Sequence, residues 1–149
     1  MAETATRTQV LTFTLDGESY GVDILAVQEI KGGAAITPVP HAPRHVRGVM
    51  NLRGAIVPVV DLRLRLGMAP AGEAHTAVIV VVRVGAHPCG LAVDSVSDVL
   101  DLAAEAIEPP PAAAARAGDG AVRGIAKADG RLVVLLDVDR LVGDDAGAA

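Results

Sequence analysis

The sequence predicts an all-β fold of small antiparallel barrels or a sandwich. Apolar runs along the 149 residues are short and separated by turn residues, and no long segment shows the 3.6-residue period of a helix. Hydrophobic residues make up 51% of the chain, yet Phe13 and Tyr20 are its only aromatic residues. The core must therefore be built from Val, Leu, Ile and Ala, and β-branched valine favours strands.

The N-terminal part predicts a β-hairpin and an extended continuation. Residues 9–15 alternate in polarity, residues 16–18 (DGE) are a turn signal, and residues 19–24 follow as the second strand. Residues 26–30 extend the apolar pattern, and the three prolines of residues 36–43 predict an extended loop or a sheet edge.

The next stretch predicts a turn, a strand and a capped helix. Residues 43–48 (PRHVRG) are typical of one helical turn. Residues 55–62 predict a strand in which Pro58 favours an edge position or a bulge. Residues 61–67 predict a short helix whose N-cap is Asp61.

The rest of the chain predicts three more strands and two loops: strands at 77–84, 89–94 and 131–137, and loops at 68–76 and 104–120. Residues 1–8 and 144–149 are expected to be flexible tails around one domain at residues 9–143.

The chain repeats itself. Residues 20–30 align with 89–99, and residues 48–67 align with 124–143. The alignment matches glycines and acidic residues: Gly21 with Gly90, Glu29 with Asp98, Gly48 with Gly124, Gly54 with Gly130, Asp61 with Asp137 and Gly67 with Gly143.

Two pseudo-repeats follow from this alignment, at about residues 10–67 and 78–143. Units of this size are each too small to be very stable alone, so we expect them to pack against each other. Their seam is then a natural binding groove. The pairing of strands across the two halves does not follow from the sequence.

Composition and charge predict a soluble protein of a reducing cytosol. The net charge of −5 and the scarcity of aromatic residues oppose binding to nucleic acid or anionic membranes. Cys89 is the only cysteine, so an intrachain disulfide is impossible. The N-terminus lacks the apolar region of a signal peptide, and the longest apolar runs are too short to span a bilayer.

The side chains for catalysis or metal binding are poorly assembled in the sequence. None of the three serines lies in G-x-S-x-G, and Cys89 is best interpreted as a buried, inert thiol. His41 and His45 have H-x3-H spacing, but Pro43 lies between them and no third ligand is near. We expect no metal site and no enzyme activity.

Two groups of charged residues are interpreted as solvated surface. One is an acidic set, Asp94, Asp98 and Asp101. The other is a basic region around short turns: Arg44, Arg47, Arg53, Arg63 and Arg65.

Glu29 and Arg53 stand apart, because each lies in a local pattern that otherwise favours burial. Glu29 is surrounded by apolar residues, and Arg53 directly precedes an apolar strand. A partly buried charge is tolerated when it is paired. We therefore hypothesise an ion pair between them, while spacing alone equally allows two independent solvated side chains.

Four segments resemble the CheW family of chemotaxis coupling proteins: residues 11–30, 48–67, 90–100 and 135–142. The resemblance covers about residues 9–143 and is carried by the combination of VQEI, NLRGAIVPVVDLR and VDSVSDV. It implies two intertwined SH3-like five-stranded β-barrels with short helical turns, which agrees with the internal duplication. The regulatory domain of the CheA kinase shares this fold, but none of the kinase parts of CheA occur here.

The resemblance also implies a function. Family members are non-enzymatic adaptors without a cofactor that bind the cytoplasmic domain of methyl-accepting chemoreceptors and the regulatory domain of the CheA histidine kinase. They act in the cytoplasm at membrane-associated receptor arrays, without nucleic acid and without membrane insertion. The family's Glu–Arg pair falls on Glu29 and Arg53. The resemblance implies a receptor-contacting groove near these residues: Ile24, Val27, Ile30, Gly48, Val49, Val96 and Val99. It implies a kinase contact at the ends of both barrels.

Two alternatives remain open. The chain could serve as the adaptor of a non-flagellar chemosensory pathway. It could also be an SH3-like or OB-like barrel that binds nucleic acid, although its acidic charge opposes this.

Overall fold

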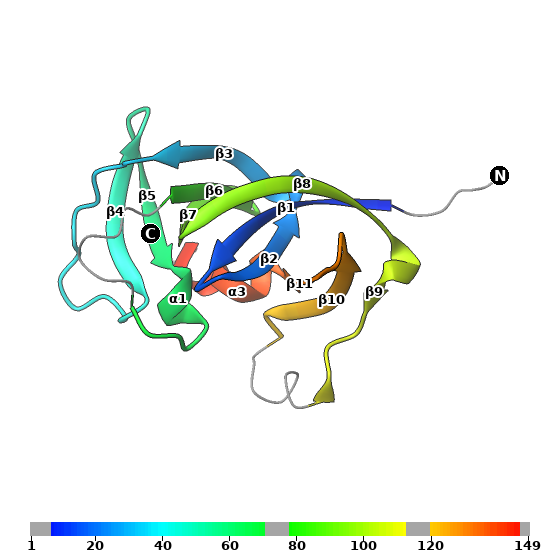
Figure 1. Cartoon of the computed structure of the whole chain (residues 1–149). Helices are drawn as coiled ribbons and strands as arrows, with labels where there is room; N and C mark the ends of the chain where they lie inside the picture. The colour runs from blue at the N-terminus through cyan, green and yellow to red at the C-terminus, as the bar shows by residue number, and fades with distance from the viewer. Residues whose placement is uncertain (1–6, 71–77, 113–119, 147–149) are drawn as a thin grey trace.

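Two β-sheets form the structure, a computed structural model that describes residues 7–70, 78–112 and 120–146 (Figure 1). One sheet has six strands in the order β8-β1-β2-β11-β10-β9: β8 (Ser95–Ala103), β1 (Arg7–Leu15), β2 (Glu18–Asp23), β11 (Arg131–Leu136), β10 (Val122–Ala128) and β9 (Ile107–Glu108). The other has five, in the order β3-β6-β7-β5-β4: β3 (Val27–Gly32), β6 (Val78–Val84), β7 (His87–Val93), β5 (Ala55–Asp61) and β4 (Val46–Leu52). The all-β prediction is therefore confirmed, although one sheet has six strands rather than the expected five, because the short β9 is added at its edge.

Short helices connect these strands. Two 3₁₀ turns, η1 (Ile24–Ala26) and η2 (Ala104–Ala106), follow β2 and β8. The helix α1 (Leu62–Arg65) follows β5, and its N-cap Asp61 accepts a hydrogen bond from the backbone N–H of Arg63, as predicted. The helix α3 (Val138–Ala146) follows β11 and packs against β5, β6 and β7.

Each sheet contains strands from both halves of the sequence. The hairpin β1–β2 leaves the first half and pairs with β8 and β11, whereas the hairpin β6–β7 leaves the second half and pairs with β3 and β5. The two exchanged hairpins join their sheets in the same way. Each makes one antiparallel contact and one parallel contact with strands of the other half.

The parallel contacts have the same register in both sheets. Val59 lies opposite Gly90 where β5 meets β7, and Leu135 lies opposite Gly21 where β11 meets β2. Both residue pairs occupy the positions that the sequence alignment matches. A Cβ at Gly90 would come within 2.8 Å of Cγ2 of Ile79 on the neighbouring strand β6, so the packing there leaves no room for a side chain.

A second matched pair of glycines allows a close passage of the chain. A side chain at Gly48 would overlap the carbonyl oxygen of Thr37, and a Cβ at Gly124 would lie 2.7 Å from the carbonyl oxygen of Glu108. Both glycines also sit at a register shift of their hairpin. The isolated bridge between Thr37 and Val49 is therefore the counterpart of the β9–β10 pairing.

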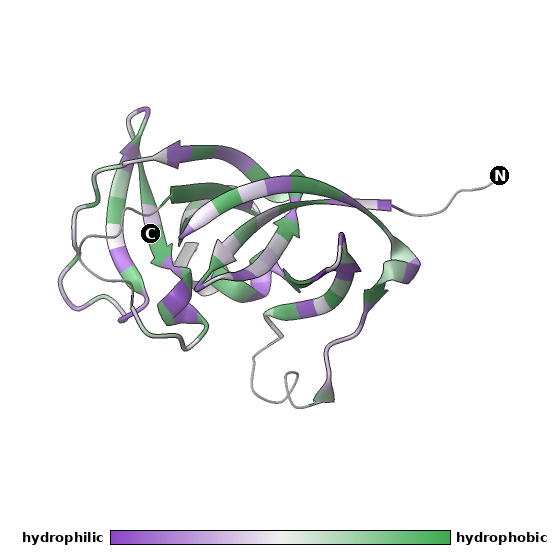
Figure 2. Cartoon of the chain, in the orientation of Figure 1, coloured by the Kyte–Doolittle hydropathy of each residue, from purple (hydrophilic) through white to green (hydrophobic). Residues whose placement is uncertain are grey.

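Three hydrophobic clusters lie in the described part of the chain. One belongs to the five-stranded sheet and includes Ile79 and Val81, and another belongs to the six-stranded sheet. The largest lies between the sheets and contains Val80 and Val82 together with Leu141 of α3. Successive valines of β6 thus face different clusters, which explains why this strand is apolar along its length (Figure 2).

Several local expectations were wrong or incomplete. Residues 43–48 form a turn that leads into β4 rather than a helical turn, because Val46 pairs with Val60 of β5. The strands β4, β8 and β10 were not predicted, since exposed or small residues interrupt their apolar patterns. Pro58 lies in an interior strand, but the ladder with β7 begins only at Val59, so β7 requires no N–H from it.

The expected tails overlap two elements. Strand β1 begins at Arg7, and α3 continues to Ala146 because Leu141 and Val142 anchor it in the largest cluster. The remaining tail residues and most of the loop expected at 68–76 lie outside the described residues. The loop expected at 104–120 was wrong at its start, because residues 104–108 form η2 and β9, and its residues 113–119 lie outside the described residues.

We predict that Gly90→Ala lowers the free energy of unfolding by about 1–3 kcal/mol, because the added methyl group would collide with the side chain of Ile79. Urea unfolding followed by circular dichroism measures this change. The control is Gly143→Ala in α3, where a Cβ has no atom within 4 Å and should be neutral or slightly stabilising. Equal stability of wild type and Gly90→Ala would contradict this tight packing.

Candidate protein-interaction surface

The side chains of Glu29 and Arg53 meet in the structure. Arg53 Nη1 lies 2.5 Å from Glu29 Oε2, and Arg53 Nη2 lies 3.3 Å from Glu29 Oε1. Glu29 belongs to β3 and Arg53 to the turn between β4 and β5, so the pair connects the two edge strands of the five-stranded sheet. The Arg53 side chain is 72% exposed, so the expectation of burial was wrong for it.

The conformation of Arg53 explains its exposure. Arg53 and Gly54 both have positive φ, as the tight hairpin between β4 and β5 requires, and this places Arg53 at the tip. An ion pair this exposed contributes about 0–1 kcal/mol to stability. The Glu29–Arg53 pair therefore matters more for the shape and charge of the surface than for the stability of the fold.

The six-stranded sheet carries a matching pair. Asp98 of β8 is the aligned counterpart of Glu29, and Arg131 Nη2 at the start of β11 lies 2.9 Å from Asp98 Oδ1. In the repeat alignment Arg53 matches Asp129, and the arginine that pairs with Asp98 is Arg131, two residues further along the hairpin. Each sheet thus has a carboxylate on its outer strand that binds an arginine of the opposite hairpin.

Asp98 also sits on a β-bulge. The register between β1 and β8 shifts between Leu11 and Phe13, opposite Val96 and Val99. The buried hydroxyl of Thr12 donates to the Asp98 carboxylate, and the Asp98 N–H donates back to that hydroxyl. The hydrogen bond from Thr12, followed by that from Arg131, lowers the pKa of Asp98 below its ordinary value.

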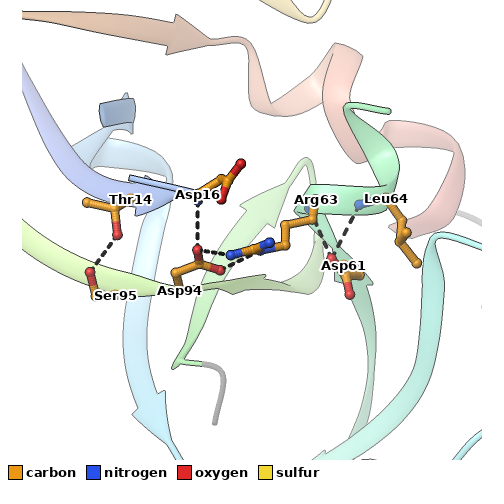
Figure 3. Close-up of polar contacts among 7 residues, drawn as sticks. All are labelled: Thr14, Asp16, Asp61, Arg63, Leu64, Asp94 and Ser95. Carbon is orange, nitrogen blue, oxygen red and sulfur yellow. Dashed lines mark hydrogen bonds and ion pairs between the residues drawn. The ribbon is translucent and has the colours of Figure 1, made fainter. Parts of the chain in front are cut away.

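A third polar cluster joins the two sheets (Figure 3). Arg63 of α1 donates from Nε and Nη2 to the two carboxylate oxygens of Asp94, at 2.8 and 2.5 Å. The same carboxylate accepts a hydrogen bond from the backbone N–H of Asp16. The hydrogen bond with Asp94 raises the pKa of Arg63 above its ordinary value. This junction was not predicted from the sequence.

The interpretation of these charges as solvated was wrong in part. The side chains of Arg63 and Asp94 are only 16% and 15% exposed. Arg65 donates to the carbonyl oxygens of Leu141 and Arg140, so it joins α1 to α3. Asp101 pairs with Arg7 on the surface, at 2.9 Å.

The apolar residues expected at an interface fall into three groups. Ile24, Val27 and Val96 are half-buried and pack against the largest core cluster. Ile30 and Val99, which the alignment matches, are 47% and 49% exposed on the edge strands β3 and β8.

The third group lies at the opposite edge of the five-stranded sheet. Gly48 is buried and Val49 is half-buried on β4, beside the backbone of Thr37. The expected residues thus lie on η1, on the two edge strands β3 and β4 of the five-stranded sheet, and on the edge strand β8 of the six-stranded sheet.

A cleft of about 440 Å³ lies at the seam between the sheets. It is formed by η1, the β6–β7 turn, β10 and the start of α3, and Asp23, Leu25, Arg83, Arg123 and Asp139 line it. The seam groove expected from the duplication is thus present, but its lining is strongly charged.

Other chemistry is sparse in the part of the chain that the structure describes. Cys89 is fully buried in β7. Within residues 7–70, 78–112 and 120–146 no three His, Cys, Asp or Glu side chains are grouped to hold a metal ion. No helix in these ranges has the length and apolar character needed to cross a bilayer.

Comparisons with known proteins identify the class. The chain is 40% identical to the chemotaxis protein CheW of Rhizobium meliloti over 131 residues, which cover 88% of this chain and 84% of that protein. It is 38% identical to the chemotaxis protein CheW of Klebsiella aerogenes over 92% of this chain and 82% of that protein. The crystal structure of the scaffolding protein TtCheW from Thermoanaerobacter tengcongensis matches with a TM-score of 0.79 at 33% identity, covering 89% of this chain and 90% of that chain.

These relatives are named chemotaxis and scaffolding proteins. Residues 9–146 also match the family model described as a CheW-like domain. The chain belongs to the CheW-like family.

We predict that the stability contributed by Asp98 is lost at acidic pH. Its pKa in the folded chain lies below the ordinary value of 3.8, so the unfolded chain binds a proton first as the pH falls. The difference in unfolding free energy between wild type and Asp98→Asn should be constant above about pH 5 and shrink as the pH falls towards the folded-state pKa. Urea unfolding from pH 7 to pH 3 measures it.

The control variant is Thr12→Val, which keeps the side-chain volume and removes the hydroxyl. It should raise the pKa of Asp98 and move the loss of stability to higher pH. A difference between wild type and Asp98→Asn that does not vary between pH 7 and pH 3 would show that Asp98 is not stabilised in this way.

Proposed function

We propose that the protein is a non-enzymatic adaptor that couples the cytoplasmic tips of chemoreceptors to the CheA histidine kinase and so controls its autophosphorylation. The observation that carries the proposal is membership of the CheW-like family along residues 9–146. Two edge strands support it, because β3 and β8 present matched apolar side chains next to matched ion pairs.

The receptor contact is proposed on these edges. A receptor tip is a helical hairpin, and an amphipathic helix binds by laying its apolar face against an apolar surface. Ile30 and Val99 supply exposed apolar contacts, and the half-buried Ile24, Val27 and Val96 lie behind them against the core. The fixed charges of Glu29 and Arg53 set the register of the bound helix.

The kinase contact is proposed at the ends of both barrels. Ile56 follows the β4–β5 turn and Leu132 occupies the matching position after the β10–β11 turn, and both side chains are mostly exposed. Gly48 and Val49 lie on the same β4–β5 hairpin as Ile56. Two such ends allow one adaptor to contact two neighbours in an array, where many weak contacts add up.

The proposed location is the cytoplasm, at membrane-associated receptor arrays. The pathway is chemotaxis or another chemosensory route that uses the same type of receptor and kinase.

The test is reconstitution of the complex. We expect this protein to bring CheA and a receptor cytoplasmic fragment into one complex on size-exclusion chromatography and to raise CheA autophosphorylation in the presence of the receptor. The protein alone should give neither activity. No gain in ternary complex and no change in the phosphorylation rate would overturn the proposal.

Charge-reversal variants supply the control. Glu29→Arg should weaken receptor binding at least tenfold, or about 1.4 kcal/mol, with little change in stability, because the ion pair is exposed. The double variant Glu29→Arg/Arg53→Glu should recover part of that loss. If the double variant bound the receptor as weakly as Glu29→Arg alone, the ion pair would have no role in receptor binding.

A further inference from the structure

The chain passes from the five-stranded sheet back to the six-stranded sheet at a single residue. Strand β7 of the five-stranded sheet ends at Val93, and β8 of the six-stranded sheet begins at Ser95. Asp94 is the only residue between them. Its conformation therefore sets the direction in which β8 leaves the first sheet.

Asp94 is held by groups from three directions (Figure 3). Both oxygens of its carboxylate bind the guanidinium of Arg63, and one of them also accepts the N–H of Asp16 at 2.7 Å. The backbone N–H of Asp94 donates to the carbonyl of Thr14 at 3.1 Å. The hydroxyl groups of Ser95 and Thr14 lie 2.6 Å apart. The corner is thus tied both to α1 and to the end of β1.

The Arg63–Asp94 pair is the most protected ion pair of β8 and its flanking residues, within the described part of the chain. Its side chains are 16% and 15% exposed, whereas both partners of the Arg7–Asp101 pair at the far end of β8 are 52% exposed. Two parallel N–H···O bonds fix both the distance and the orientation of the carboxylate. Loss of Arg63 would leave the Asp94 carboxylate partly buried without its bidentate partner.

The strand that follows Asp94 has a break in its ladder with β1. The ladder between β1 and β8 is broken at the bulge opposite Thr12, three to four residues after Asp94. Val96 and Val99 border that bulge. Among the described strands β8 pairs with β1 alone, so the position of Val96 depends on the anchor at Asp94 as well as on β1 and on the hydrogen bonds that Thr12 makes with Asp98.

We propose that Arg63 and Asp94 are positioning residues that hold the receptor-facing part of β8, from Val96 to Val99, in its binding geometry. This inference rests on the proposed receptor contact. Neither residue needs to touch the receptor. Arg63 acts from α1 of the opposite sheet, so the orientation of the two sheets and the shape of the receptor surface are coupled through one ion pair.

The test compares Arg63→Met and Asp94→Asn with the control Arg7→Met, which removes the exposed pair at the other end of the same strand. Amide hydrogen exchange is measured over residues 94–100, together with the dissociation constants for a receptor cytoplasmic fragment and for the regulatory domain of CheA. All variants are measured well below their unfolding transitions.

We expect Arg63→Met and Asp94→Asn to speed exchange in residues 94–100 and to weaken receptor binding at least tenfold. Binding to the CheA regulatory domain should change less than twofold, and Arg7→Met should stay within twofold of wild type in both assays. Arg63→Lys, which keeps the charge without the planar fork, should lie between wild type and Arg63→Met. If Arg63→Met does not fold, Asp94→Asn and Arg63→Lys carry the comparison.

The outcomes separate the two proposals. Wild-type protein that fails to bind the receptor fragment overturns the proposed function and the positioning role with it. Wild-type binding that Arg63→Met and Asp94→Asn leave within twofold overturns the positioning role alone. A loss of receptor binding with unchanged exchange in residues 94–100, or an equal loss of CheA binding, also overturns it.

Discussion

The exchange of hairpins between the two halves is the constraint on which the structure depends. Each half donates two strands to the sheet of the other, and each donated hairpin ends in a parallel contact at a glycine, Gly90 or Gly21. If either half were missing, the sheet built mainly by the other half would lack two of its interior strands. The largest hydrophobic cluster, which lies between the sheets, forms only when both halves are in place. The chain therefore behaves as one body although its sequence contains two similar units.

This arrangement accounts for the position of the polar groups. Ion pairs connect elements that the exchange brings together from distant parts of the sequence: Arg63 with Asp94, and Arg131 with Asp98. The most protected of them lies where the chain crosses from one sheet to the other. The exposed pairs lie on the outer strands, beside apolar side chains that the core does not use. The framework is thus rigid where the sheets join and open at their edges, which suits a protein that holds partners rather than one that encloses a substrate.

Much of the fold was predictable from the sequence, because turns, caps and repeated glycines act locally. The hairpin at Asp16 and Gly17, the α1 helix capped by Asp61 and the match of Gly21 with Gly90 follow from residue type and spacing, whereas the register of the parallel contacts at these glycines does not. The edge strand β8 was not predicted, because most of its residues are exposed and its apolar residues do not alternate regularly. The pairing of Glu29 with Arg53 was proposed from their local patterns, but the Arg63–Asp94 junction depends on a strand crossing that no local pattern reveals. The match of Asp98 to Glu29 in the repeat was the available signal for the second pair.

Assembly of the protein from two separate chains tests the central claim most directly. Residues 1–70 and 71–149 would be produced as two polypeptides, alone and together, and examined by circular dichroism and native mass spectrometry. Strand exchange predicts that neither fragment folds alone and that the mixture forms a one-to-one complex with a cooperative unfolding transition. Two fragments that each fold independently into a closed barrel, with no complex on mixing, would contradict it.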